Sequence, residues 1–398
     1  MGKQYISTVS ASKAHKSDIY GVEITSKYTI SISSDGYAKF WDNKKDEVHQ
    51  PTDFVQSLFI NASGIHHLSV YENKIPSSTV QVTILAFACF NGEIFFKYYI
   101  NGDFARIKDI AFKLEKCWIP GFYVDPENKQ DFFLVTKMNG VTEVYTLSIE
   151  SKEEEEEEEE VSIKFEKYGD LGGSTTTGSS RSWPSSSFSN SLSVNQTENK
   201  KCAVGHMNGN VLLYDFQTLK LVYTFKSTDL VVSRNPKLNS SSSVPRALAF
   251  SPGGTLLAVA RDNQAAGSIT LYDVQYGENV GTLATPSHSA KSVVGGFAHQ
   301  GWIMGLDFDE TGKNLVSCGF DKCVRVWDLD TREREATINI SISDFDDTTT
   351  DQQDESIASG VKFIKKGIRG GAGGDNNDGI CVVSFDRGIR WYREAGGI

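Results

Sequence analysis

The stretch Gly319-Phe320-Asp321-Lys322-Cys323-Val324-Arg325-Val326-Trp327-Asp328 joins a polar turn to a short apolar run that ends on an aromatic–acid pair. A second stretch, Ser34-Asp35-Gly36-Tyr37-Ala38-Lys39-Phe40-Trp41-Asp42, repeats that order. More degraded copies occur elsewhere, so that the unit is present seven times. Its aromatic position falls in turn at Trp41, Lys97, Tyr145, Tyr214, Tyr272, Trp327 and Tyr392. A short unit that recurs along the whole chain indicates a repeat architecture.

The spacing of the copies identifies the repeat. Neighbouring copies lie 48 to 69 residues apart, somewhat more than the roughly 40–45 residues of a four-stranded propeller blade. Within a copy, continuous apolar runs such as Leu256–Ala260 are typical of strands buried on both faces, and Gly, Asn and Asp turns separate them. We therefore predict an all-β, seven-bladed β-propeller in which each blade carries additional loop residues.

The two ends of the sequence indicate how the ring closes. The last copy ends at Tyr392, which leaves no room for a further outer strand. The segment 4–9 precedes the first blade and has the composition of a strand. We expect it to pair as the outer strand of blade seven, because this arrangement removes a free sheet edge.

Three polar segments are expected to be loops of a single domain that spans residues 1–398. Residues 150–185 combine the run Glu153–Glu160 with a Ser/Thr/Gly tract, a composition that predicts disorder. Residues 341–357 are acidic, and residues 367–379 are rich in glycine.

Charge and composition exclude several classes of function. The net charge is −11, but eight of these charges belong to the glutamate run, so the remainder is near neutral. Direct binding of nucleic acid needs a basic surplus, which is missing. A basic cluster near the C-terminus leaves such contact open as a minor alternative: Lys362, Lys365, Lys366, Arg369, Arg387, Arg390 and Arg393.

No apolar run reaches the ~18 residues of a membrane span, and the N-terminus lacks the apolar core of a signal peptide. The six cysteines have no C-x-x-C spacing, which favours reduced core residues and a cytosolic or nuclear protein. His66 and His67 lack a further His or Cys at metal spacing, and no phosphate-binding loop is present. We expect neither a metal nor another cofactor.

Two quartets of polar and aromatic residues recur in the same order at blade spacing: His15, Ser31, Asp35, Trp41 and His299, Ser317, Asp321, Trp327. Serine, histidine and aspartate could form the triad of a propeller hydrolase. A catalytic set would occur once, however, and no G-x-S-x-G turn is present. We interpret the quartets as buried hydrogen-bond chains in which Asp holds His and the indole N–H finds an acceptor, in a protein that is not an enzyme.

The residues that open the innermost strands should gather on one rim of the ring. Tyr, Trp and Arg, which dominate protein-interaction hot spots, occur among them. We predict a partner-binding patch there, with packing in the core as the alternative, formed by Asp18, Ile19, Tyr20, Ile65, His66, Trp118, Ile119, Arg246 and Trp302.

The turns and Trp-Asp pairs resemble those of WD-repeat propellers along the whole chain. A narrower resemblance, to the fungal WD-repeat subunit of the superkiller (Ski) complex, lies in Lys13-Ala14-His15, Ser63–His67, Phe297-Ala298-His299 and Ile389–Gly397. It implies a scaffold without catalytic activity that binds a tetratricopeptide subunit and supports a DExH RNA helicase. That assembly feeds mRNA to the exosome for 3′-to-5′ decay in the cytoplasm.

The same resemblance implies a nuclear role in meiotic recombination, through contact with the Spo-eleven transesterase. Partners of that family carry short motifs with Gln-Arg and a following apolar residue. Asp18 together with Tyr20, Trp118 and Trp302 would accommodate such a motif. The alternative is a WD-repeat adaptor of a ubiquitin ligase or a chromatin complex.

Overall fold

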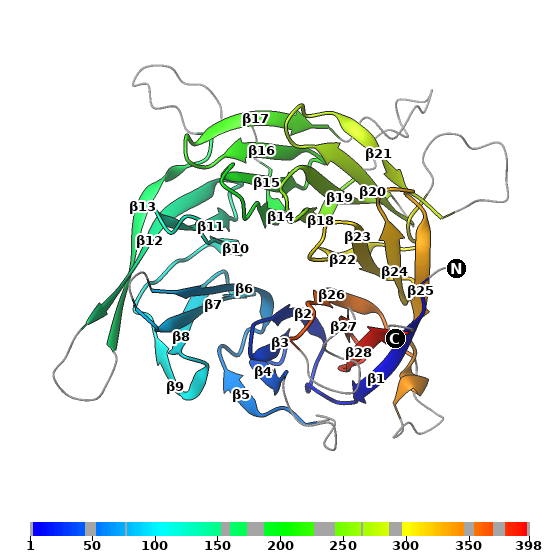
Figure 1. The fold of residues 1–398 in the computed structure, drawn as a ribbon, viewed down its shortest axis with the longest axis horizontal. Helices are drawn as coiled ribbons and strands as arrows, with labels where there is room; N and C mark the ends of the chain where they lie inside the picture. Colours follow the sequence, from blue (N-terminus) through cyan, green and yellow to red (C-terminus); the bar gives the residue numbers. More distant parts are fainter. Residues whose placement is uncertain are drawn as a thin grey trace.

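The computed structural model describes residues 3–43, 53–75, 78–152, 160–172, 187–226, 243–263, 266–285, 297–345, 354–368 and 379–395. In these ranges the chain forms seven four-stranded antiparallel sheets around a central axis (Figure 1). The only helical segment among them is the 3₁₀ turn η2 (Ile342–Asp344). Over the same ranges, no helix has the length and apolar character needed to cross a membrane. The predicted seven-bladed propeller is confirmed.

The blades follow one another in chain order, each from its innermost to its outermost strand. They are β2 (Ile19–Ile24), β3 (Tyr28–Ser33), β4 (Tyr37–Asp42), β5 (Gln56–Phe59); β6 (Ile65–Lys74), β7 (Gln81–Cys89), β8 (Ile94–Ile100), β9 (Asp103–Asp109); β10 (Cys117–Tyr123), β11 (Asp131–Lys137), β12 (Thr142–Lys152), β13 (Glu160–Asp170); β14 (Ser189–Val194), β15 (Lys201–His206), β16 (Val211–Asp215), β17 (Lys220–Phe225); β18 (Pro245–Phe250), β19 (Leu256–Asn263), β20 (Ala266–Asp273), β21 (Asn279–Leu283); β22 (Ile303–Phe308), β23 (Asn314–Gly319), β24 (Cys323–Asp328), β25 (Arg334–Asn339); and β26 (Ala358–Ile364), β27 (Gly379–Ser384), β28 (Ile389–Glu394), β1 (Tyr5–Ala11).

Blade seven is completed by the N-terminal strand. β1 pairs antiparallel with β28, from Tyr5 opposite Glu394 to Ala11 opposite Ile389, and lies against it in Figure 1. The Thr8 hydroxyl adds a hydrogen bond to the carbonyl of Trp391 at 3.1 Å. The predicted ring closure is therefore present.

The core consists of apolar wedges between neighbouring blades. Strands β3, β7 and β27 are buried along all or nearly all of their length, as expected for strands covered on both faces, whereas outer strands such as β5 are largely exposed. One wedge joins Phe40 of blade one to Phe87 of blade two. The wedge between blades one and seven contains Trp41 and Trp391, whose rings lie 5.9 Å apart.

The segment expected to be a loop over 150–185 differs from that expectation in part. Residues 160–170 form β13, which pairs with β12 over its full length to make a long hairpin. Polar residues alternate with Val161, Ile163 and Phe165 there, and this alternation suits an outer strand with one covered face. Residues 153–159 and 173–186 lie outside the described residues, as do 346–353 and 369–378 of the other two predicted loops.

Blade two is a regular blade although its aromatic position is a lysine. Lys97 lies in β8, and its ammonium pairs with Asp109 of the outer strand β9. The ion pair lets the long side chain occupy the place of the aromatic ring without leaving a buried charge unpaired.

Because consecutive strands are antiparallel, the disc has two distinct faces. We call upper the face on which the innermost strands begin and on which the turns between second and third strands lie. The lower face carries the ends of the innermost strands, such as Glu23 of β2 and Asp307 of β22. All seven innermost strands line a central cavity of about 200 Å³.

Candidate protein-interaction face

In blade six the quartet forms a continuous hydrogen-bond chain beneath the upper face. The Trp327 indole N–H donates to Ser317 at 2.9 Å, and the serine hydroxyl lies 2.7 Å from His299 Nε2. His299 Nδ1 lies 2.8 Å from a carboxylate oxygen of Asp321. Arg325 also donates to that carboxylate, at 2.7 Å. The chain links strands β23 and β24, and the turn between them, to the segment that leads into the blade.

Blade one has the same chain without its last link. His15 lies 2.6 Å from the Ser31 hydroxyl and 3.1 Å from Asp35. The indole N–H of Trp41 is buried and has no acceptor among the described residues, contrary to our expectation. Ring packing against Trp391 and Phe54 holds the Trp41 side chain instead.

The protonation states of the histidines and of Asp35 agree with a structural role for the quartets. Burial lowers the pKa of His15 and of His299, so both imidazoles are neutral at neutral pH. Burial alone would raise the pKa of Asp35, but hydrogen bonds from His15 and two backbone amides lower it to about 2. Ser31 and Ser317 have no exposed surface. A substrate could not reach either hydroxyl, and this geometry disfavours the hydrolase alternative.

Blade seven contains a comparable centre that the sequence reading missed. Arg390 is fully buried and donates to Asp386 at 2.6 Å, to Asp344 at 2.9 Å and to Ser384 at 2.7 Å. Arg390 stands two residues before the aromatic position Tyr392, as Arg325 stands two residues before Trp327 in blade six. The basic cluster expected near the C-terminus is therefore not a single charged surface, since Arg390 is internal and Lys362 pairs with Glu23.

The upper face exposes five of the nine residues predicted for partner binding. Trp302 is 43% exposed, and Asp18, Tyr20, Trp118 and Arg246 are half-buried. They come from blades one, three, five and six and surround the upper mouth of the central cavity. These five remain candidates for contact with a partner.

The other four predicted residues are buried. Ile19, Ile65 and Ile119 are at most 4% exposed, and Ile19 and Ile65 belong to interblade wedges. His66 is 5% exposed. The prediction that these residues contact a partner is wrong, because their side chains are covered by neighbouring residues of the blades and offer no surface.

An aromatic arc runs along the upper face from blade seven to blade four. Tyr20 lies between Phe385 and Phe90, with ring centroids 5.5 and 5.3 Å away. His66 stacks on Trp118 with centroids 3.9 Å apart, and the same indole meets Phe188 at 5.3 Å. His66 also contacts Phe90, with ring centroids 4.9 Å apart, so the arc is continuous across five blades.

Trp302 belongs to a second group on the opposite side of the central cavity. The Arg246 guanidinium lies over its ring, 4.7 Å from the centroid, and is fixed there by a 2.6 Å ion pair with Asp262. Phe320 contacts the indole with centroids 5.8 Å apart. One face of Trp302 is thus already covered by an internal cation.

Sequence reasoning also missed five apolar side chains that precede the turns of the upper face. Each follows the second strand of its blade, and four of the five are 38–46% exposed. The signal was available, since each stands directly before an Asn or Asp turn; they are Phe90, Met138, Met207, Phe320 and Phe385. Large apolar residues at equivalent exposed positions indicate an interaction surface.

Asp18 provides the negative charge of this surface. Burial, followed by the nearby carboxylate of Glu355, raises its pKa, and Arg387 partly offsets the effect. Tyr20 is two residues away, and the pKa of its phenol is raised by burial and by Asp18. A carboxylate that is poorly compensated beside aromatic rings is suited to a cationic group from a partner.

His66 and His67 form a neutral pair. Their Nδ1 atoms are 2.6 Å apart, and His66 Nε2 is 3.2 Å from the carbonyl of Cys89. Burial lowers the pKa of His66 to about 2 and that of His67 to about 4. Across the described residues, no group of three or more His, Cys, Asp or Glu side chains could hold a metal ion.

The fold, the repeated turns and the exposed aromatic rim define a WD-repeat propeller with the surface of an interaction module. Residues 291–328 match the family model of the WD domain, G-beta repeat. The chain is 35% identical to the antiviral protein SKI8 of Saccharomyces cerevisiae over the full length of both chains. It belongs to the SKI8 family of WD-repeat proteins.

Two further relatives match over smaller shares. The meiotic recombination protein rec14 of Schizosaccharomyces pombe is 23% identical over 70% of this chain and 74% of its own length. The WD repeat-containing protein 1 of Gallus gallus is 25% identical over 38% of this chain and 20% of its own length.

Proposed function

We propose that this chain is the scaffold subunit of a superkiller complex, which binds a tetratricopeptide subunit and supports a DExH RNA helicase in exosome-mediated 3′-to-5′ mRNA decay. The observation that carries the proposal is identity of 35% to SKI8 along the entire length of both proteins. A match that spans the whole of both chains favours a shared scaffold role over a shared single repeat. The proposal implies a cytoplasmic protein without catalytic activity.

A second role, in the nucleus, is the initiation of meiotic recombination through the Spo-eleven transesterase. The match to the meiotic recombination protein rec14 over 70% of the chain supports it. Both roles use the same scaffold, and the upper face would bind one partner at a time.

The upper face fits a short motif that carries an arginine and an apolar residue. Arg246 already occupies the ring of Trp302, so we assign the arginine of the partner to Asp18, with Tyr20 and Phe385 as its aromatic walls. The apolar residue of the motif would then lie on the aromatic arc or on the exposed part of Trp302. Aromatic anchors of this kind contribute much of the energy in protein interfaces.

The test is capture of the tetratricopeptide subunit from extract by tagged protein. Trp302→Glu should abolish capture and leave the melting temperature unchanged, because the side chain is 43% exposed. The matched control is Tyr276→Glu, which alters a 65% exposed aromatic residue in the turn after β20, on the lower face. Normal capture by the Trp302 variant would remove this residue from the site, and a collapsed fold would identify it as core.

Asp18→Arg tests the polar half of the surface. It reverses the charge offered to the arginine of the partner, and we expect a loss of affinity of at least tenfold, or about 1.4 kcal/mol. Unchanged affinity would exclude Asp18. Recovery of cullin or histone-modifying proteins instead of tetratricopeptide and helicase subunits would favour the adaptor alternative.

A further inference from the structure

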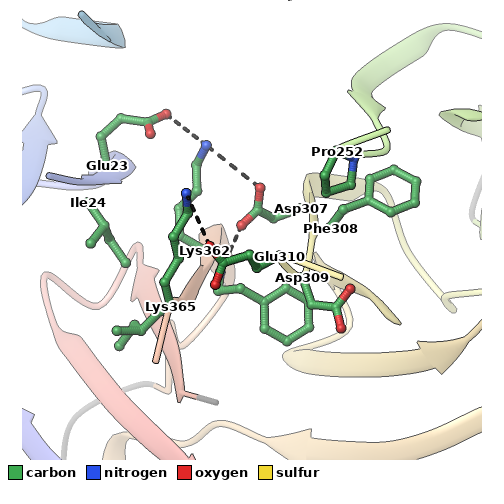
Figure 2. A pocket seen from close by; sticks show the side chains of 11 residues that line it. Glu23, Ile24, Pro252, Asp307, Phe308, Asp309, Glu310, Lys362 and Lys365 are labelled. Atoms are coloured by element: carbon green, nitrogen blue, oxygen red, sulfur yellow. Dashed lines mark hydrogen bonds and ion pairs between the residues drawn. The ribbon is translucent and has the colours of Figure 1, made fainter. Parts of the chain in front are cut away.

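A second cavity lies on the lower face, away from the surface described above. It has a volume of about 260 Å³ and is formed where the innermost strands of blades six, seven and one end. Figure 2 shows its charged residues gathered around one opening, with Lys362 between Glu23 and Asp307. The cavity serves no part of the proposed partner capture at the upper face.

Its charges do not balance. Lys362 pairs with Glu23 at 2.9 Å and lies 4.0 Å from Asp307, and Lys365 lies 4.0 Å from Glu310. Two lysines thus face three carboxylates. Asp309 also lines the cavity, but its oxygens accept hydrogen bonds from its own turn, at Thr311 and Asn314.

Asp307 is the carboxylate that remains short of partners. One oxygen accepts a hydrogen bond from the backbone amide of Phe363 at 2.8 Å. The other has no donor within hydrogen-bond distance in the described part of the chain, since Lys362 is 4.0 Å away. Burial raises the pKa of this carboxyl to about 6. Lys362, 4.0 Å away, therefore offsets the effect of burial on this carboxylate only in part.

The walls of the cavity suit a long side chain with a charged end. Ile24, Pro252 and Phe308 supply apolar surface beside the carboxylates. Methylene groups pack on such surface while the charged end meets the acids. A guanidinium can bond two carboxylates at once through its planar fork. An anion is disfavoured, because both lysines already face carboxylates.

We propose that this cavity receives an arginine side chain from a protein partner, as a second docking site on the lower face. The arginine would donate to the Asp307 oxygen that has no donor and would reduce the net negative charge of the cavity. The upper and lower faces could then be occupied at the same time.

The probe is N-acetyl-argininamide, titrated into the full chain while the methyl resonances of Ile24 and Ile364, which line the cavity, are followed by NMR. We expect saturable shifts of both methyls. N-acetyl-citrullinamide, which has the same shape without the charge, should produce none. Equal shifts with the two probes, or no saturable shift with the first, would overturn the proposal.

Asp307→Asn should weaken binding of the arginine probe about tenfold, the scale expected for loss of a charge-assisted hydrogen bond. The control Asp330→Asn removes an exposed carboxylate of the same face and should leave binding unchanged. Unaltered binding by the Asp307 variant, with near-UV circular dichroism matching the parent, would contradict the assignment.

A measurement on the unmodified chain covers the case in which the Asp307 variant does not fold. Asp307 faces Glu23 from β2, Lys362 from β26, and Glu310 and Lys365 from the adjoining turns. Burial raises the pKa of Asp307 to about 6, so this carboxylate takes up a proton just below neutral pH. The affinity for the probe should therefore fall between about pH 7 and about pH 5, and a flat profile would count against the proposal. Capture of the tetratricopeptide subunit through the upper face is independent of this result.

Discussion

The hydroxyl of Ser317 is the hydrogen-bond partner of two buried polar groups in blade six. It accepts the indole N–H of Trp327 at 2.9 Å and lies 2.7 Å from His299 Nε2. All three residues are at most 1% exposed, so bulk water cannot replace the lost partner. Ser317→Ala therefore leaves a donor and an acceptor without hydrogen bonds.

The expected loss can be compared with that of the equivalent change in blade one. Each buried polar group left without a partner costs about 1–3 kcal/mol, so Ser317→Ala should cost about 2–6 kcal/mol. Ser31→Ala orphans only His15 Nε2, since Trp41 has no acceptor among the described residues to lose. Its cost should be about 1–3 kcal/mol, roughly half as much.

Guanidinium denaturation followed by tryptophan fluorescence measures both losses in the same background. Equal slopes for the parent and the two variants would allow the midpoints to be compared directly. Trp327→Phe in the Ser317→Ala background should recover part of the loss, because it removes the orphaned donor. Equal losses for the two serine variants, or a larger loss for Ser31→Ala, would refute the hydrogen-bond account of the quartets.

Two further predictions concern buried charges. The pKa of Asp35 falls from the unfolded value of 3.8 to about 2, so its carboxylate stabilises the fold above about pH 4, and this contribution is lost as the pH falls towards 2. We expect Asp35→Asn to remove about 1–2 kcal/mol of the acid dependence of the free energy of unfolding. An unchanged dependence of stability on pH would contradict this prediction. Arg390→Met should lower the free energy of unfolding by about 3–5 kcal/mol, because it leaves the 2% exposed carboxylate of Asp386 without its cation. Thermal unfolding measures this loss, and a melting temperature equal to that of the parent would contradict the pairing.

Much of the fold could be predicted because the strands and turns of each repeat are determined by residues close together in the sequence. The polar turns, the buried strand Leu256–Ala260 and the strand composition of residues 4–9 each specify their structure without distant information. Lys97 could be assigned to a strand by its position in the repeat alone. The hairpin strand β13 could not, since its covered face depends on the neighbour it meets.

The site was harder to predict because exposure depends on the side to which a strand turns each residue. Ile19 and Tyr20 are adjacent in the sequence, yet the first is fully buried and the second lines the upper face. One acidic partner of Arg390, Asp386, is four residues away, but the other, Asp344, is 46 residues away along the chain, and the burial of the side chain could not be inferred from the local sequence. Phe90 and its equivalents could have been found only by aligning the turns of the seven repeats and comparing the residue that precedes each turn.

The pairing of β1 with β28 has a consequence for how the molecule is made. During synthesis, β1 emerges early and remains unpaired until the rest of the propeller has been translated. Blade-by-blade folding can proceed from β2 onward, but the seam between blades one and seven cannot seal until residues 389–394 leave the ribosome. Until then the growing chain carries an open β edge, which can pair with other chains.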